Sequence, residues 1–153
     1  MYSPVKVRAA YSYRNDMAVP CFDDSSPIVF MDGLCALCTR AARLICKFDG
    51  VFKISPTGSD LGRAILAHYG LNSENPASWL YLEEGKAYGS MEAVIRVGTR
   101  LGGWCRSVEL LRLLPGRLQN RLYQCLPDNR YRLFGRDDMC AVPDPELQRR
   151  LLL

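Results

Sequence analysis

The chain has 153 residues, of which 48% are hydrophobic and 24% charged, and its formal net charge is +4 at pH 7. This length suits one domain, which can bury roughly 70% of the surface of its unfolded chain and needs no disulfide or structural metal to fold. The lysines and arginines are scattered without a run of five, so nucleic acid is not an expected partner. Seven cysteines without a signal-peptide pattern disfavour a secreted disulfide scaffold and favour a reducing, cytoplasmic location.

Residues 1–26 mix aromatic, charged and proline residues without a clear period, which predicts a loosely structured N-terminal arm. The domain proper is expected at 27–153. It begins with an apolar run at 27–31 that predicts a fully buried strand, broken by Asp32-Gly33. Residues 36–48 then alternate apolar and basic positions with a helical period, which predicts an amphipathic helix.

Further elements follow in a regular order. They are a strand at 51–54 closed by Ser55-Pro56, a helix capped by Ser59, short strands at 79–82 and 87–88, and a helix that is capped by Ser90 and runs to Leu101. Helical crossovers between the first strands predict parallel pairing, and the tight turn at 84–86 predicts an antiparallel hairpin. The order β-α-β-α-β-β-α predicts an α/β fold with a thioredoxin-like core and a mixed sheet.

The residues beyond 102 predict a helical C-terminal extension. We expect a helix at 107–114, a second at 118–126, a break at 127–129 and a short helix at 130–134, with an irregular tail that ends in a turn or two. Four leucines within 110–114 form a ridge expected to pack on the sheet, the alternative being a partner interface. No apolar run reaches 18 residues, so no membrane span is expected.

Cys35 and Cys38 lie three positions apart where the buried strand leads into the first helix. The N–H groups and positive dipole end of that helix favour a thiolate at Cys35, and Cys38 lies about one turn further, within reach of a disulfide. The pattern predicts a thiol–disulfide oxidoreductase in which Cys35 attacks and Cys38 resolves the mixed disulfide. Asp32 is either a proton acceptor for Cys38 or a cap that orients the loop, and its charge opposes a thiolate at Cys35. Arg40 and Arg43 either support that thiolate or face solvent.

The motif Asp32-Gly33-x-Cys35-x-x-Cys38 after an apolar strand resembles the DCC family of predicted thiol–disulfide oxidoreductases, named for that Asp and the two Cys. The likeness covers about 27–143 and includes Ser90, Pro115, Asn129-Arg130-Tyr131 and Cys140. It implies a thioredoxin-like fold and partners that are protein or small-molecule thiols and disulfides, but no particular substrate. The chain departs from thioredoxins in its Ala36-Leu37 insert, and Pro76 lies two residues too early to match their cis-proline.

The rival interpretation is a non-enzymatic module on the same fold, which uses the loop at 32–38 to dock a protein or bind a metal. A structural zinc site needs a second close pair of Cys or His, whereas the chain has one histidine and no second Cys pair. We therefore expect no metal or other cofactor, and a structural His68. Cys140 is interpreted as a free buried cysteine, and the alternative is a third redox thiol or a regulatory partner. Trp79 is interpreted as a core or surface aromatic. Asn129-Arg130-Tyr131 is interpreted as a helix cap and ion pair that lock the C-terminal helices onto the core, and the alternative is substrate contact. The sequence specifies no oligomeric state.

Overall fold

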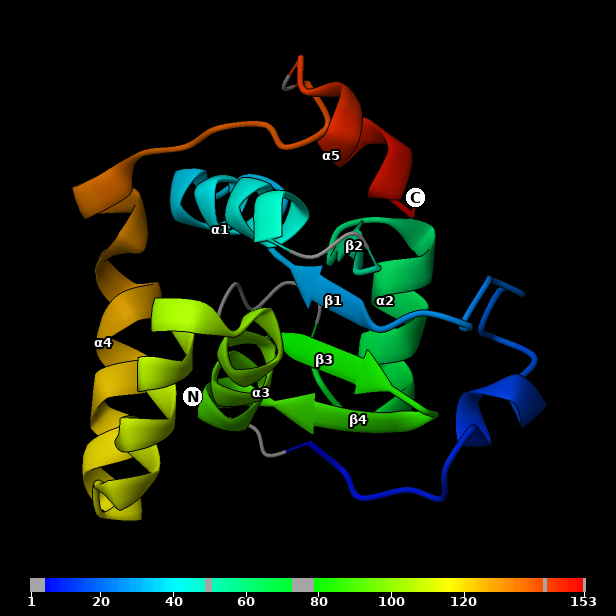
Figure 1. Ribbon diagram of the computed structural model, residues 1–153. Coiled ribbons are helices and arrows are strands. Elements are labelled where there is room, and N and C mark those ends of the chain that lie inside the picture. The colour runs from blue at the N-terminus through cyan, green and yellow to red at the C-terminus, as the bar shows by residue number, and fades with distance from the viewer. Residues whose placement is uncertain (1–4, 49–50, 73–78, 142, 153) are drawn as a thin grey trace.

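The computed structural model describes residues 5–48, 51–72, 79–141 and 143–152, built around a four-stranded mixed sheet (Figure 1). The strands are β1 (Ile28–Met31), β2 (Lys53–Pro56), β3 (Leu80–Glu83) and β4 (Lys86–Gly89), in the spatial order β2-β1-β3-β4. β1 pairs in parallel with β2 and antiparallel with β3, and β4 completes an antiparallel hairpin with β3. The predicted α/β fold class with a thioredoxin-like core is confirmed.

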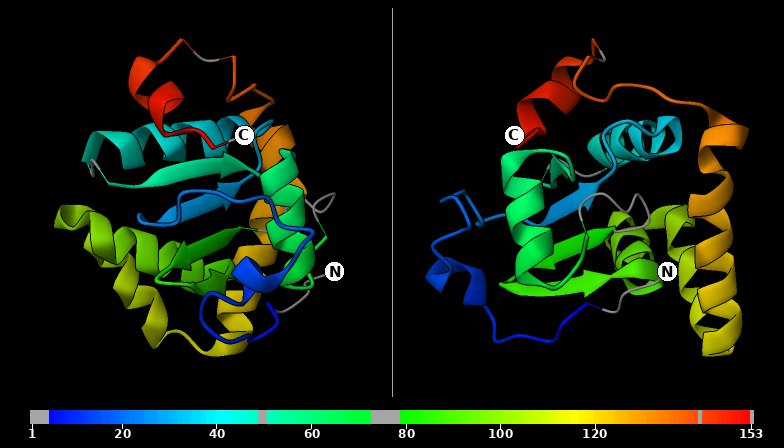
Figure 2. Two further views of the ribbon diagram at one scale, coloured as in Figure 1. Left: turned by 90° about the vertical axis from the view of Figure 1, so that its right-hand side faces the viewer. Right: turned by 180° about the vertical axis from the view of Figure 1, so that it is seen from behind.

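Helices cover both faces of this sheet. α1 (Ala36–Phe48) and α3 (Ser90–Leu101) pack on one face, and α2 (Asp60–His68) packs on the other (Figure 2). Successive side chains of β1 point to opposite faces, so Val29 and Met31 join the cluster with α1 and α3, whereas Ile28 and Phe30 join the cluster with α2. A strand buried on both sides explains why the run at 27–31 is apolar without alternation.

The second strand lies two residues later than predicted. Its pairing with β1 starts at Lys53 and runs through Ser55 to Pro56, the two residues expected to close it. Proline has no backbone N–H to donate to a neighbouring strand. It is tolerated here because β2 is an edge strand, with a sheet neighbour on one side only. Ser59 caps α2 as predicted, since its hydroxyl accepts a hydrogen bond from the Gly62 N–H at 3.0 Å. The predicted cap at Ser90 is wrong, because Ser90 is the first residue of α3 and the extended Gly89 before it takes the cap position.

The first element beyond α3 is η2 (Gly103–Leu113), a 3-10 helix rather than a helix from residue 107. It lies close to α3, where a Cβ on Gly98 would be 2.3 Å from a methyl group of Val108. Leu111 packs into the cluster with α3, but Leu110 and Leu113 are exposed. The expected packing of the leucine ridge on the sheet is therefore wrong, because a helix with three residues per turn points only every third side chain at α3.

α4 (Gly116–Phe134) is one continuous helix, so the predicted break at 127–129 is also wrong. A proline inside a helix costs about 3 kcal/mol. Contacts on both sides of Pro127 offset this cost: Tyr123 is buried in the cluster with α3, and the Tyr131 hydroxyl donates to Asp32. Tertiary packing of the two halves thus overrides the local signal.

The N-terminal arm, as far as residues 5–26 describe it, packs beside α2. Its 3-10 helix η1 (Ser12–Asn15) holds the buried ring of Tyr13, whose hydroxyl donates to the Asp24 carboxylate at 2.7 Å. The ring of His68 at the end of α2 bonds the Ser12 hydroxyl at 2.9 Å through Nε2 and the Asp16 carboxylate at 2.7 Å through Nδ1. The hydrogen bond from His68 holds the pKa of the Asp16 carboxyl below its usual range.

Replacing His68 with alanine will loosen the arm, because both hydrogen bonds of the buried ring join the arm to α2. We expect the free energy of unfolding to fall by about 1–3 kcal/mol in urea titrations. Trypsin should also cut faster at Arg8 and Arg14. The control is Ser12→Ala, which removes one of the two bonds and should have a smaller effect. Unchanged stability and cleavage in His68→Ala would contradict this role.

The C-terminal residues return to the sheet. Asp144 caps α5 (Pro145–Arg150) by accepting a hydrogen bond from the Glu146 N–H at 3.1 Å. The Leu152 N–H then donates to the Ile54 carbonyl at 2.8 Å, and the chain covers the outer edge of β2. Among the described residues, no helix is both long and apolar enough to cross a membrane.

Candidate functional site

The two motif cysteines meet where β1 leads into α1. Cys35 directly precedes α1, and Cys38 lies in its first turn. The two residues approach to 3.6 Å and are not joined by a disulfide. Cys35 is 0% exposed and Cys38 is 2% exposed. Because neither residue is accessible in this conformation, attack on a substrate disulfide requires a local opening.

The loop at 32–35 is held in place by its own backbone and by β2. One carboxylate oxygen of Asp32 accepts a hydrogen bond from the Leu34 N–H at 2.9 Å. Gly33 lies against the end of β2, where a Cβ would be 3.0 Å from the Cβ of Pro56. A side chain at position 33 would therefore require Pro56 to shift by a few tenths of an ångström, so glycine suits this close approach of the loop to β2.

The second carboxylate oxygen of Asp32 accepts a hydrogen bond from the hydroxyl of Tyr131, in the last turns of α4. Asp32 is buried, so two directed donors stabilise its carboxylate within the protein. The guanidinium of Arg136 lies 4.9 Å from the centroid of the Tyr131 ring. Tyr131 was interpreted from the sequence as part of a lock on the core, and the structure shows that its contact is the motif loop itself.

Trp79, next to the start of β3, contacts the second cysteine. Its indole N–H donates to the sulfur of Cys38 at 3.4 Å, and a donor at this position favours the charged form of a thiol. The sequence interpretation treated Trp79 as a core or surface aromatic and missed this contact. Its position before the third strand was a usable signal, since thioredoxins place their cis-proline there, facing the dithiol. Pro76, the residue compared with that proline, lies outside the described residues.

A segment that we call the C-terminal strap (residues 135–139) pairs with the motif loop. The Met139 N–H donates to the Gly33 carbonyl at 2.8 Å, and the Asp137 N–H donates to the Leu34 carbonyl at 3.1 Å. Arg136 forms an antiparallel bridge with Cys35, and Gly135, at φ 79°, ends α4 in a left-handed conformation. The strap therefore contributes to the burial of Cys35.

The strap also uses part of the helix N-terminus. The N–H of Ala36, the first residue of α1, donates to the Gly135 carbonyl at 3.4 Å. That donor is therefore not aimed at the sulfur of Cys35. The helix N-terminus invoked from the sequence has fewer free donors than the motif alone suggests.

The other candidates lie away from the dithiol. Arg40 and Arg43 are exposed, and Nε of Arg43 lies 3.7 Å from a carboxylate oxygen of Asp144. Of the two alternatives given for these arginines, the structure therefore supports the one in which they face solvent. Cys140 is exposed, so the interpretation of this residue as a buried cysteine is wrong. Its thiol is still partly buried, and this burial together with the charge of Asp138 raises the pKa of that thiol. Within the described ranges, no group of three or more His, Cys, Asp or Glu residues is placed to hold a metal ion.

A mixed sheet whose first strand leads into a helix that begins with a close pair of cysteines is consistent with a thioredoxin-like core. The chain belongs to the DCC1-like thiol-disulfide oxidoreductase family, whose family model matches residues 29–136. The resemblance stated from the motif is thus confirmed, and the family supports a redox role.

Two curated relatives are similar over most of the chain. The uncharacterized protein YuxK of Bacillus subtilis is 30% identical over 127 residues, which cover 82% of this chain and 93% of that protein. A DCC family protein of Arabidopsis thaliana (At1g52590), named chloroplastic, is 26% identical over 123 residues, which cover 78% of this chain and 72% of that protein. No solved structure matches the chain.

Proposed function

We propose that this protein is a thiol–disulfide oxidoreductase whose reacting groups are the thiols of Cys35 and Cys38. The observation that carries the proposal is that Cys35 and Cys38, two cysteines not joined in a disulfide, lie 3.6 Å apart at the start of α1. A helix N-terminus and a second thiol one turn away are the two features that dithiol exchange needs. The family description supports the same chemistry.

The reaction proceeds by two displacements at sulfur. The Cys35 thiolate attacks a substrate disulfide, so that a mixed disulfide forms and the first substrate thiolate leaves. Cys38 loses its proton and attacks the sulfur of Cys35, which releases the second substrate thiolate and closes the Cys35–Cys38 disulfide. The substrate gains two electrons. A small thiol or a partner reductase in a reducing, cytoplasmic compartment then donates two electrons to the Cys35–Cys38 disulfide and regenerates the two thiols. The reverse sequence oxidises a dithiol, and the reduction potential sets the direction.

Asp32 and Trp79 act in the second displacement. The indole N–H of Trp79 stabilises negative charge on Cys38 as its proton leaves. Asp32, already oriented by Leu34 and Tyr131, is the proposed acceptor of that proton. Its buried negative charge opposes a thiolate at Cys35, so the same residue limits the resting reactivity of the attacking thiol.

A glutathione redox titration tests the proposal. The protein should carry serine at its three exposed cysteines (Cys21, Cys125 and Cys140), so that surface thiols do not contribute. We expect one reversible disulfide, mapped by mass spectrometry to Cys35 and Cys38, with a potential between roughly −120 and −270 mV. A pair that never bridges, or that copurifies with stoichiometric zinc, would overturn the proposal and favour the binding module.

Replacing Tyr131 with phenylalanine tests the link between α4 and the motif loop. The change keeps the ring and removes the donor to Asp32, and a hydrogen bond to a charged group contributes about 1.5–3 kcal/mol. We expect the rate of disulfide exchange to change by about tenfold. Tyr88→Phe on β4 is the control for the loss of a hydroxyl, and should keep the parent rate. Equal rates in all three proteins would show that the Tyr131 hydroxyl does not act through Asp32.

A further inference from the structure

The outer face of η2 is an exposed apolar ridge. Three residues per turn align Trp104, Leu110 and Leu113, which are 74%, 65% and 81% exposed. Cys105 and Leu111, on another side of the same helix, are the residues that are buried or packed toward α3. η2 therefore has two apolar sides. One side packs toward α3, and the described residues leave the other side exposed.

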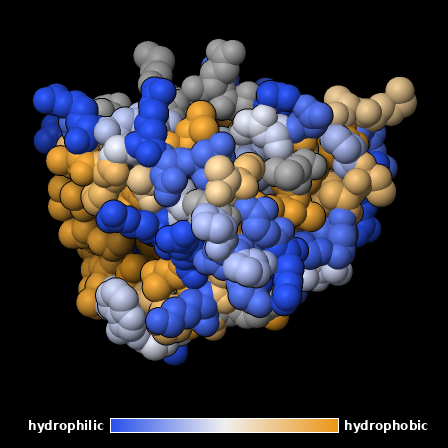
Figure 3. Space-filling model, turned by 90° about the horizontal axis from the view of Figure 1, so that it is seen from above, coloured by the Kyte–Doolittle hydropathy of each residue, from blue (hydrophilic) through white to orange (hydrophobic). Residues whose placement is uncertain are grey.

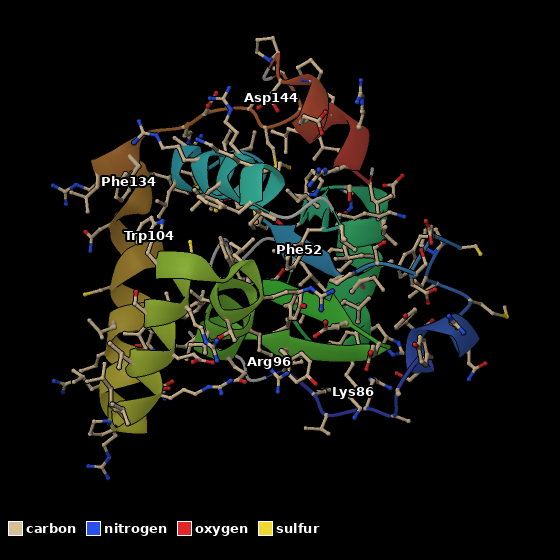
Figure 4. All side chains as sticks on the ribbon, in the orientation of Figure 1. Phe52, Lys86, Arg96, Trp104, Phe134 and Asp144 are labelled. Atoms are coloured by element: carbon tan, nitrogen blue, oxygen red, sulfur yellow. The ribbon has the colours of Figure 1, made fainter. Side chains whose placement is uncertain are left out.

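α4 carries a second exposed apolar stripe. Leu118, Leu122 and Leu133 recur at helical spacing on one side and are all exposed. Figure 3 shows hydrophobic residues gathered along its left-hand edge, the side on which α4 lies in Figure 1. Trp104 and Phe134 also lie on this side (Figure 4). Exposed apolar side chains gathered along one side of the molecule in this way indicate an interaction site.

Positive charge is concentrated in the same two helices. Residues 103–136 contain seven arginines and two acidic residues, so the rest of the chain has a net charge of −1 although the whole is +4. Arg117, Arg121 and Arg132 are exposed on α4, and on a helical projection they lie beside the leucine stripe. Among the described residues, no ion pair is recorded for these three arginines.

We propose that η2 and α4 form a docking surface for the anionic face of a lipid bilayer. Tryptophan and leucine side chains enter the boundary between headgroups and acyl chains, while flanking arginines bind lipid phosphates. A second copy of the chain would cover the ridge only by bringing two arginine-rich surfaces together, which charge repulsion disfavours. Nucleic acid would pair with the arginines but leave the leucines and Trp104 in water. This inference does not depend on dithiol activity.

Vesicle sedimentation tests the proposal with the full chain. We expect the protein to sediment with vesicles of phosphatidylcholine containing about one-third phosphatidylglycerol, and not with phosphatidylcholine alone. Raising the salt from about 0.1 M to about 0.5 M should weaken binding, because it screens the arginines. Trp104→Ser/Leu113→Ser and Arg117→Gln/Arg121→Gln should each weaken binding roughly tenfold or more. All four residues are exposed, so folding should be kept.

The matched control is Val7→Ser/Arg8→Gln, which removes one exposed apolar side chain and one exposed charge from the N-terminal arm. It should bind vesicles as the parent does. No binding to anionic vesicles, or equal binding by all variants, would overturn the proposal. Two other results would overturn the proposal if the protein does not bind vesicles. One is a dimer that dissociates in the Trp104→Ser/Leu113→Ser variant, and the other is retention of the protein on single-stranded nucleic acid.

Discussion

Replacing Cys38 with serine will leave the protein covalently joined to its substrate through Cys35. Without the second thiol, the mixed disulfide formed by Cys35 cannot be resolved within the chain. Incubation with glutathione disulfide should therefore yield a near-stoichiometric glutathione adduct on Cys35, where the parent protein forms the Cys35–Cys38 disulfide instead. Intact-mass measurement and peptide mapping distinguish the two products.

Two further variants assign the roles of the thiols. Cys35→Ser should form no stable adduct at this site, because it lacks the attacking group. Cys46→Ser, a change at a buried cysteine further along α1, should behave as the parent does, since burial raises the pKa of the Cys46 thiol and keeps it protonated. An adduct on Cys38 in Cys35→Ser, with none in Cys38→Ser, would reverse the assignment. The Trp79 hydrogen bond would then mark Cys38 as the attacking thiol.

Replacing Met139 with alanine will both destabilise the protein and expose its dithiol. The Met139 side chain is fully buried in the cluster that contains both cysteines, and its N–H donates to Gly33. Truncation of such a side chain costs about 2–5 kcal/mol, which urea unfolding will measure. Because the strap pairs with the motif loop, we also expect alkylation of Cys35 by iodoacetamide to be at least about tenfold faster.

The alkylation must be measured well below the unfolding transition, so that local opening is separated from global unfolding. Leu133→Ala, at an exposed position six residues earlier, is the control and should change stability by less than about 0.5 kcal/mol. A Met139→Ala protein that loses stability but keeps the parent alkylation rate would show that the strap does not control access to Cys35.

The sequence by itself determined the features that depend on neighbouring residues. The apolar run at 27–31, the cap at Ser59 and the turn at 84–86 are local signals, and each produced its element. The proximity of Cys35 and Cys38 is also a local feature. Two residues three positions apart at the start of a helix lie on the same side of it, whatever the helix packs against. Asp32 is near them for the same reason, through the loop that it orients.

Only the tertiary structure decided what surrounds the dithiol and how the extension folds. Tyr131 meets Asp32 across 99 positions of the chain, and Trp79 meets Cys38 across 41. Helical or strand period says nothing about such pairs, because they arise when separate elements pack. Packing also carried α4 through Pro127 at a local cost of about 3 kcal/mol, and left Leu110 and Leu113 of η2 in solvent while Leu111 packs toward α3. Local propensity is worth too little to decide between such alternatives once buried contacts at both ends of an element favour one of them.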